Sequence, residues 1–447
     1  MTKQKIPELI KIEHAKILIW RRKGGVMSEE SRLAANLKRQ LSRFSGIISK
    51  RFNKAKHKLI KEMLYGIQAS KDVKLSNISR TLKEDQRLIK TEDRLSRNLD
   101  DEDFTAGIND EICRLASSKV TDDMVIAIDP GDIIKKYAKK MEFLGRVRDG
   151  SEHEIGNGYH LCKVVAADIE SKKVIPLYCE AYSYLACDIK SENDQIFKAI
   201  DTIFKHMGEK GIHAIDRGGD RGLIYEKYLR RDKPVKFVIR LTERDLIHKG
   251  RAKSCSDMAK SLPTPYETIL ILYDNGKEKK RKVEYNAVPV KLPKFGNKLY
   301  FVVVKGFGEK PMMLLTSLKL NIYRKESIWR IVEYYLARWK CEESYRYIKQ
   351  CYNLEDIRVR SYIGIRNLVV LVLAVSYFAA VYLGQSIKLK LLVERIFLIS
   401  KRLFGIPSFF NYAIADGIFN LLFPDKTALR GIRPNTIDDF QLRFQFG

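Results

Sequence analysis

The chain has 447 residues, with 83 Lys and Arg against 55 Asp and Glu, and this net charge of +28 indicates a polyanionic partner such as nucleic acid. Its seven cysteines form no Cys-x-x-Cys pair, which argues against a zinc module or a disulfide framework and is typical of a reducing cytoplasm. No P-loop is present, so nothing in the sequence indicates the use of a nucleoside triphosphate.

Residues 1–115 are predicted to be a helical, basic, DNA-binding region. The first 100 residues carry 25 basic and 11 acidic side chains, so half of the net charge lies in less than a quarter of the chain. The segment 64–99 predicts several short helices, and residues 75–82 would be one helix of a helix-turn-helix-like unit. The same apolar spacing would also pack any small helical bundle. The arginines that this unit would offer to phosphates or base edges are Arg80, Arg87, Arg94 and Arg97.

Two short apolar runs in residues 116–244 end at an aspartate. The run 124–128 ends at Asp129, and the run 213–215 ends at Asp216, each followed by glycine within two residues. Continuous β-branched runs of this kind predict buried central strands. A carboxylate at the end of such a strand is costly to bury unless it is paired or binds a metal.

The elements around these aspartates have the order of a ribonuclease-H-like α/β core. Three successive strands are followed by alternating helix and strand, and the central strand ends converge at one edge, which places Asp129 beside Asp216. The further elements predicted are strands at 158–167, 173–179 and 235–240 and helices at 191–210 and 223–231.

Residues 245–322 are predicted to be a β-rich subdomain inserted into this core, because some 125 residues separate Asp216 from Glu342 and many of them have strand character. The expected strands are 267–273, 282–288, 299–304 and 312–315. Trp329 and Trp339 follow the insertion. Either ring would stack on a base flipped out of DNA, although packing in the core is the favoured role.

A helix across residues 335–349 would bring chemistry-bearing side chains to one face. Tyr335, Arg338, Glu342 and Lys349 are spaced by three, four and seven residues, so all four project together. Glu342 would complete three acidic ligands with Asp129 and Asp216 for two Mg²⁺ or Mn²⁺ ions. Arg338 and Lys349 would hold phosphates, and Tyr335 would donate a hydrogen bond to a phosphate oxygen.

The remaining segments complete the predicted domain organisation. Residues 323–385 would be the last part of the core and 386–447 a helical tail for protein contacts. Residues 368–383 are mostly apolar, but they fall short of the roughly 20 residues that span a bilayer, so a buried core helix is expected rather than a membrane segment.

The gapless Tyr-x₂-Arg-x₃-Glu-x₆-Lys pattern of residues 335–349 resembles the signature of a large group of bacterial insertion-sequence transposases of the DDE class, the family-four type. The run 216–220 resembles the motif around the second catalytic aspartate of that group, and Asp129 matches the first. Many relatives carry a hydroxyl residue after the first aspartate, where this chain has Pro130. Asp132 therefore stays an alternative to Asp129, and Asp220 a weaker one to Asp216.

This resemblance implies a transposase that cuts at the terminal inverted repeats of its element and joins the ends to target DNA. It further implies a β insertion that contacts double-stranded DNA, a dimeric synaptic complex, hairpin ends in some members, and a cytoplasmic, nucleoid-associated location in bacteria. Three alternatives stay open from the residues: a stand-alone nuclease of the same fold, a non-catalytic DNA-binding regulator derived from a transposase and, as the remote third, a membrane protein.

Overall fold

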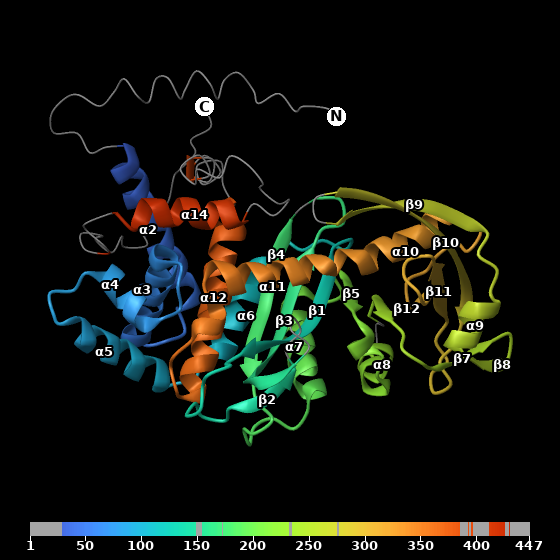
Figure 1. Cartoon of the computed structure of the whole chain (residues 1–447), viewed down its shortest axis with the longest axis horizontal. Helices are drawn as coiled ribbons and strands as arrows, with labels where there is room; N and C mark the ends of the chain where they lie inside the picture. Colours follow the sequence, from blue (N-terminus) through green and yellow to red (C-terminus); the bar gives the residue numbers. More distant parts are fainter. Residues whose placement is uncertain are drawn as a thin grey trace, which may run out of the picture.

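The structure, a computed structural model, describes residues 29–148, 154–171, 173–231, 235–274, 277–384, 392, 395–396, 411–424 and 429. The first 28 residues of the predicted helical region and most of the predicted tail at 386–447 lie outside these ranges. The described chain is a mixed α/β protein built around one large sheet (Figure 1).

The amino-terminal elements are helical, as the sequence predicted. They are α2 (Glu29–Ile48), α3 (Lys54–Ser70), α4 (Leu75–Leu82), α5 (Leu88–Asp100) and α6 (Thr105–Ala116). The predicted start of helical structure at Leu64 falls inside α3, whose first turn is capped by the side chain of Asn53 accepting from the backbone N–H of Lys56 at 3.0 Å. The core of this helical part joins the sheet through α12 (Tyr362–Ala380), which contacts α3, α5 and α6.

The following elements alternate between strands and helices. In chain order they are β1 (Val125–Ile134), β2 (Gly145–Arg148), β3 (Ile155–Ala167), β4 (Val174–Tyr182), α7 (Glu192–Met207), β5 (Ile212–Ile215), α8 (Gly222–Leu229), β6 (Phe237–Arg240), β7 (Asp245–His248), β8 (Arg251–Ser254), α9 (Cys255–Ser261), β9 (Tyr266–Asp274), β10 (Lys277–Val290), β11 (Leu299–Lys305), β12 (Met312–Thr316), α10 (Lys325–Ala337), α11 (Trp339–Cys351), α12 and α14 (Asn411–Leu422), with short 3₁₀ turns between some of them.

Ten of these strands form a single sheet in the order β2-β3-β1-β5-β6-β12-β11-β10-β9, with β4 also paired to β3. The strands β1, β5 and β6 are parallel, whereas β3 is antiparallel to β1 and β4 is antiparallel to β3. The strands predicted for 245–322 are present, but they continue this sheet because β12 pairs with β6, rather than forming a sheet of their own. Among the described strands, only the short β7–β8 hairpin stands apart.

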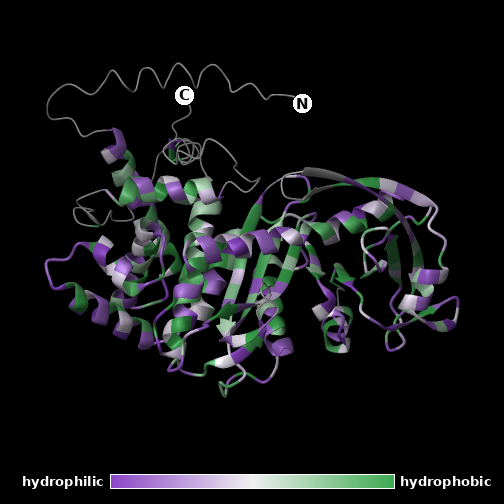
Figure 2. Cartoon of the chain, viewed as in Figure 1, coloured by the Kyte–Doolittle hydropathy of each residue, from purple (hydrophilic) through white to green (hydrophobic). Residues whose placement is uncertain are grey.

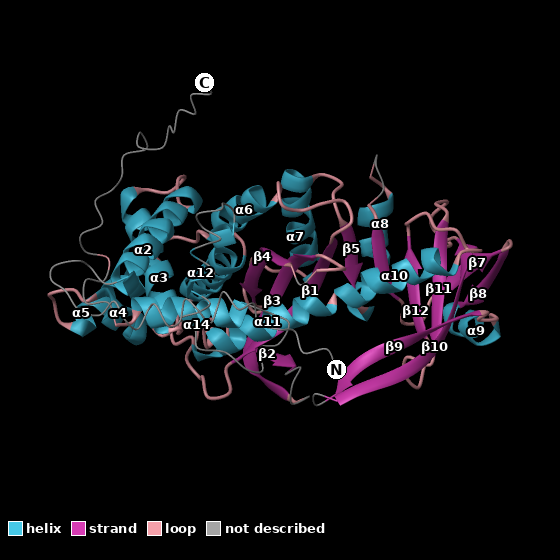
Figure 3. Ribbon diagram, turned by 90° about the horizontal axis from the view of Figure 1, so that it is seen from above, coloured by secondary structure: helices cyan, strands magenta, loops and turns pink. Residues whose placement is uncertain are grey.

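Helices cover both faces of the sheet. Figure 3 shows α6, α7 and α8 on one side and the long run of α10 and α11 on the other, with the β9–β10 ribbon extending away from the sheet on the side of α10 and α11. Figure 2 shows that the central strands and α12 are largely hydrophobic, in keeping with their burial. These layers enclose a continuous apolar core.

Helix α12 confirms the expected core helix. It is long and apolar enough to cross a membrane by length and composition, but 89% of its most apolar window is buried inside the protein. It also carries polar side chains that form hydrogen bonds with backbone groups inside the protein. Asn367 donates to the carbonyls of Leu99 and Glu102 at 2.8 Å and accepts from the backbone N–H of Phe104 at 2.9 Å.

Two predicted boundaries need correction. The strand expected to end at Asp129 continues to Ile134, because β3 pairs with β1 as far as Ile134 and Gly158. Pro130 is tolerated there since β1 has no partner on the β5 side beyond Ile128 among the described strands. The helix expected across 335–349 is divided at Arg338 into α10 and α11, where the backbone tightens into an i to i+3 hydrogen bond.

Candidate functional site

The two predicted aspartates lie side by side at one edge of the sheet. The parallel pairing of β1 with β5 ends at Ile128 and Ile215, so Asp129 and Asp216 are the next residues on neighbouring strands. Strands that pair lie about 4.8 Å apart, which sets the scale of the separation between the two backbones. We call this region, where Asp129 and Asp216 follow the last pair of the β1–β5 ladder, the carboxylate edge.

Glu342 reaches the same place from the first turn of α11. The junction between α10 and α11 passes beside β1 and β5, and the guanidinium of Arg338 lies among all three carboxylates. Its Nη1 donates to Asp129 Oδ1 at 3.1 Å, and its Nη2 donates to Glu342 Oε1 at 2.7 Å and lies 3.9 Å from Asp216 Oδ2. Three acids from three separate elements therefore share one cation.

The Arg338 side chain is more deeply buried than the three carboxylates that it contacts. The Arg338 side chain is 4% exposed, whereas the side chains of Asp129, Asp216 and Glu342 are 22%, 43% and 49% exposed. The cation thus lies beneath the carboxylates, and Arg338 Nε is buried with no hydrogen-bond partner among the described residues. A positive ligand arriving from solvent would meet the carboxylates first.

The charge on Asp216 is favoured by its neighbours. Burial acts to raise the pKa of this carboxyl, but the hydroxyl of Tyr335, which donates to Asp216 Oδ1 at 2.6 Å, and the guanidinium of Arg338 outweigh it and lower the pKa. Arg240 at the end of β6 adds a further cation 4.0 Å from Asp216. Tyr335, which was expected to donate to a phosphate oxygen, therefore donates to Asp216 in this structure.

Asp129 is in the opposite situation. Burial raises the pKa of its carboxyl to about 6, and the negative charges of Glu342 and Asp216 add to the rise, while Arg338 opposes it. Burial is the largest cause, so the charged form of Asp129 is the one that its surroundings disfavour. Such a carboxylate gains stability from any additional cation that reaches it.

A buried lysine lies under the same edge and was not predicted from the sequence. Lys163 is the partner of Asp129 in the β1–β3 register and is 1% exposed. Its ammonium donates to Ser344 Oγ of α11 at 3.0 Å, which ties the helix carrying Glu342 to the central sheet. Burial lowers the pKa of this ammonium. A single Lys in an apolar strand gives no signal until the strand register is known.

Lys349 lies two turns beyond Glu342 and contacts a different set of residues. Its ammonium pairs with Asp132 Oδ2 at 3.2 Å and with Glu355 Oε1 at 2.7 Å. Arg338, rather than Lys349, is the cation that bridges the three acids. Asp132 is therefore engaged by Lys349, and Asp129 is the aspartate of β1 that the structure brings together with Asp216 and Glu342.

The other alternative, Asp220, has a structural role. Its side chain is 1% exposed, accepts from Arg244 Nε at 2.7 Å, and accepts from both the backbone N–H and the hydroxyl of Thr242 at 2.8 Å. These bonds fix the loop after β6 to the loop after β5. Nothing in this arrangement leaves Asp220 open to a ligand.

The chemistry of the three acids fits a divalent metal ion. Carboxylate oxygens are the ligands that Mg²⁺ and Mn²⁺ prefer, and Asp129, Asp216 and Glu342 bring three such groups to one cation. Within the part of the chain that the structure describes, no three His, Cys, Asp or Glu side chains are close enough together to hold an ion as they stand. The guanidinium of Arg338 lies between the acids, so binding would require them to close in on the ion.

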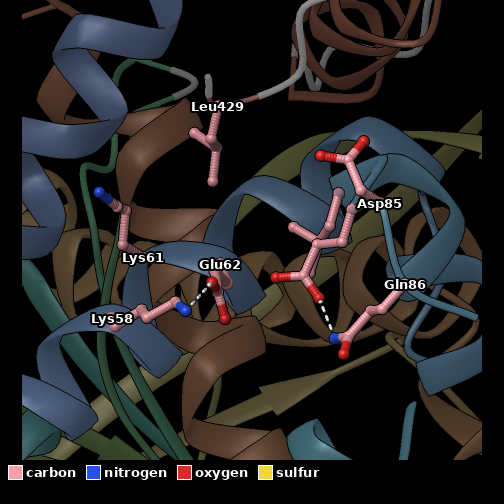
Figure 4. A pocket seen from close by; sticks show the side chains of 8 residues that line it. Lys58, Lys61, Glu62, Asp85, Gln86 and Leu429 are labelled. Carbon is pink, nitrogen blue, oxygen red and sulfur yellow. Dashed lines mark hydrogen bonds and ion pairs between the residues drawn. The ribbon is translucent and has the colours of Figure 1, made fainter. Parts of the chain in front are cut away.

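A polar cavity of about 500 Å³ lies elsewhere, in the helical part, between α3 and the loop that joins α4 to α5 (Figure 4). Its lining has mixed charge, and two of its carboxylates are already paired. Arg94 binds Glu62 at 2.7 Å and Glu84 at 2.9 Å. Arg94 therefore stabilises the interior of the helical part and is not open to phosphates as predicted, whereas Arg80, Arg87 and Arg97 are exposed.

The two tryptophans after the insertion differ. Trp329 is partly buried and packs against the ring of Tyr285 at 5.2 Å, which matches the favoured core role. Trp339, the first residue of α11, is 39% exposed and contacts the ring of Phe307 at 5.8 Å.

No protein-family model matches the chain, and no curated protein matches it. Among solved structures, the chain is similar to the piggyBac transposase in a cryo-EM structure of its synaptic complex with hairpin DNA. The TM-score is 0.38 and the sequence identity 10%, over 96% of this chain and 79% of that chain. The similarity is too weak to carry an inference about what this chain binds.

Proposed function

We propose that this chain is a DNA transposase of the DDE class, which cleaves DNA at the ends of its element and transfers the strands to target DNA. The observation that carries the proposal is the convergence of Asp129, Asp216 and Glu342 on Arg338 at one edge of the sheet. The strand order β4-β3-β1-β5-β6, with the first three antiparallel and the last three parallel, supports a ribonuclease-H-like core for residues 116–244 and 323–385.

The three acids would hold two Mg²⁺ or Mn²⁺ ions. When bound, such ions activate an attacking oxygen and stabilise the leaving oxygen of a phosphodiester. Tyr335 orients Asp216 through the 2.6 Å hydrogen bond, and Lys163 fixes α11, which carries Glu342. Arg338 and Tyr335 each donate hydrogen bonds to these carboxylates. Once those charges are neutralised, their donors become free to bind phosphate oxygens beside Lys349.

We further propose which parts of the chain bind DNA, in what oligomeric state the enzyme acts and where it is located. The basic helical region 1–115 would bind the terminal inverted repeats, with the exposed Arg80, Arg87 and Lys90 around the α4–α5 turn among its phosphate ligands. The β-rich segment 245–322 would contact DNA as well, and the enzyme would act as a homodimer in the synaptic complex. The resemblance to insertion-sequence transposases of bacteria supports a nucleoid-associated location in the cytoplasm.

Cleavage of element ends tests the proposal. A labelled duplex carrying the terminal repeats is incubated with a target plasmid and Mg²⁺ or EDTA, using wild type, Glu342→Gln and Glu343→Gln. Glu343 is a matched control because it is the next residue and pairs with Arg346 at 2.7 Å instead of joining the acids. We expect cleavage and joining that need the metal, vanish in Glu342→Gln and persist in Glu343→Gln. Cleavage without joined products would indicate a nuclease, and binding without cleavage by wild type would indicate a regulator.

A further inference from the structure

Strand β9 ends the large sheet and leaves one of its edges open. It pairs with β10 along all nine of its residues, and no described strand pairs with its other side. No backbone hydrogen bond from another described segment reaches that side either. Half of the backbone N–H and C=O groups of an edge strand point away from the sheet, so β9 presents a row of donors and acceptors to a further strand.

The opposite end of the sheet is protected, whereas β9 is not. β2 is four residues long and carries Arg146 and Arg148, and every residue of β4 is buried. β9 lacks the devices that usually keep an edge from pairing, because it contains no Lys, Arg or Pro and its register with β10 runs without a bulge. An edge of this length and composition favours the addition of another strand.

Two isoleucines stand exposed beside the open edge. Ile269 is 63% exposed and Ile271 is 52% exposed, while Leu270 between them packs against the core from the other face of the strand. The residue opposite Ile269 in β10 is Lys282, which already pairs with Glu267 at 2.6 Å. Exposed apolar side chains next to an unpaired edge mark this strand as an interaction surface.

The sequence of β9 suits pairing with a copy of itself. A two-fold axis at Leu270, the middle residue of the nine, would pair the whole strand in antiparallel register with the β9 of a second copy. Ile269 would then face Ile271 of the second copy, and Ile271 would face Ile269. The acidic positions 267 and 274 would each face a tyrosine position, so no like charges would lie directly opposite each other, where they destabilise a sheet.

Charge favours a second copy over DNA as the occupant of this edge. Residues 261–276 contain no Lys or Arg, although the chain as a whole has a net charge of +28. Binding to DNA depends on cations that neutralise phosphates, and this stretch offers none. Copies of so basic a chain repel one another, and the repulsion is weakest where cations are missing.

We propose that two copies of this chain associate through an antiparallel β9–β9 pair, which joins their two large sheets into one. The pair assigns a surface to the homodimer of the proposed function, and it rests on that proposal only for the use of the dimer at DNA ends. Self-association through β9 itself needs neither DNA nor metal.

Sedimentation equilibrium of the full chain, without DNA and in EDTA, tests the proposal. Wild type should be a dimer at micromolar concentration. Ile269→Glu/Ile271→Glu should weaken the dimer by at least about tenfold, because two pairs of like charges would face each other across the axis. Within one chain the new carboxylates would lie opposite Lys282 and Lys280, which preserves the β9–β10 ribbon. Ile269→Glu/Ile271→Lys sets opposite charges across the axis and should restore the dimer.

A control and a second measurement locate the interface. Leu223 of α8 is 53% exposed and lies outside β9, so Leu223→Glu should leave the dimer unchanged. Hydrogen exchange at the amides of residues 266–274 should be slower in wild type than in Ile269→Glu/Ile271→Glu, because pairing covers the open edge.

Three results would overturn the β9 interface: a monomeric wild type, a dimer that Ile269→Glu/Ile271→Glu leaves intact, or no recovery of the dimer in Ile269→Glu/Ile271→Lys. If wild type cuts element ends and any of these results is found, the transposase proposal stands and the interface is wrong. If the dimer responds as expected and wild type cuts nothing, the interface stands and the proposed function is wrong.

Discussion

Replacement of Arg338 by methionine should destabilise the chain strongly in the absence of divalent ions and much less in their presence. The guanidinium is 4% exposed and contacts all three acids, so its loss leaves partly buried carboxylates facing one another without their shared cation. Removing one partner of a buried ion pair costs about 3–5 kcal/mol, and the partial exposure of the acids places Arg338→Met toward the lower end of that range.

Divalent metal should restore much of this loss if the acids are the ligands that we propose. A ligand at a hundred times its Kd stabilises the folded state by about 2.7 kcal/mol. Since the uncharged side chain of the variant would no longer compete for the carboxylates, Mg²⁺ should bind the variant more tightly than wild type and raise its stability by more. The difference between the two proteins should therefore shrink as Mg²⁺ is added.

Urea unfolding followed by tryptophan fluorescence measures this effect, with and without Mg²⁺. Urea is preferable to guanidinium because it does not screen charges, and Trp329 and Trp339 report on α10 and α11 directly. Arg346→Met is the control on α11, because Arg346 forms an exposed pair with Glu343 that is worth about 0.5 kcal/mol at most. A loss below about 1 kcal/mol for Arg338→Met, or a loss that Mg²⁺ leaves unchanged, would refute the reasoning.

Two further predictions concern stability away from the acids. His213 packs between Phe204 and Tyr228, and burial lowers its pKa to about 3 against an unfolded value of about 6.5. The contribution of the neutral His213 to the free energy of unfolding is fully present above about pH 6.5. It is lost progressively as the pH falls from there toward about 3. The free energy of unfolding should therefore drop by about 2 kcal/mol between about pH 7.5 and pH 5 on account of this group. His213→Phe should remove that part of the pH dependence, and an unchanged slope in urea titrations at the two pH values would contradict it. In the helical part, a Cβ on Gly66 would lie 2.3 Å from Ile78 Cγ2, so Gly66→Ala should cost about 1–3 kcal/mol by forcing α3 and α4 apart. Gly46→Ala, where a Cβ would meet nothing within 4 Å, should be neutral or slightly stabilising, and thermal unfolding of the two variants beside wild type measures both effects.

The sequence favoured Asp129, Asp216 and Glu342 but left Asp132 and Asp220 as alternatives, and the structure brings the three favoured acids together. Apolar runs that end at Asp129 and Asp216 predict neighbouring central strands, and the structure pairs those strands in parallel up to the residue before each aspartate. The three-residue and four-residue steps from Tyr335 to Glu342 likewise predict a shared helical face, and the division at Arg338 does not disturb it. In each case the relevant geometry is fixed by a few adjacent residues.

Features that depend on pairing between distant segments could not be predicted in this way. The strands at 299–305 and 312–316 have clear local patterns, but only the pairing of Leu315 with Ile239 makes them part of the central sheet. Lys163 gives no signal in its apolar strand, although register sets it opposite Asp129. The role of Arg94 was mistaken for the same reason, because Glu62 and Glu84 reach it from α3 and from the loop after α4.

Arg338 shows why a residue can be recognised correctly and its immediate contacts still be missed. Spacing on a helix predicts that Arg338 and Glu342 face the same way, and a polyanionic substrate then makes phosphate the expected partner of the cation. In the structure, however, the three acids converge on Arg338, and their mutual repulsion is relieved by this buried cation. Arg338 holds the acids together and would be released from them when a metal ion binds. Metal binding to the acids would then free Arg338 to bind DNA phosphates. That link makes the response of Arg338→Met to Mg²⁺ the sharpest test of how the site works.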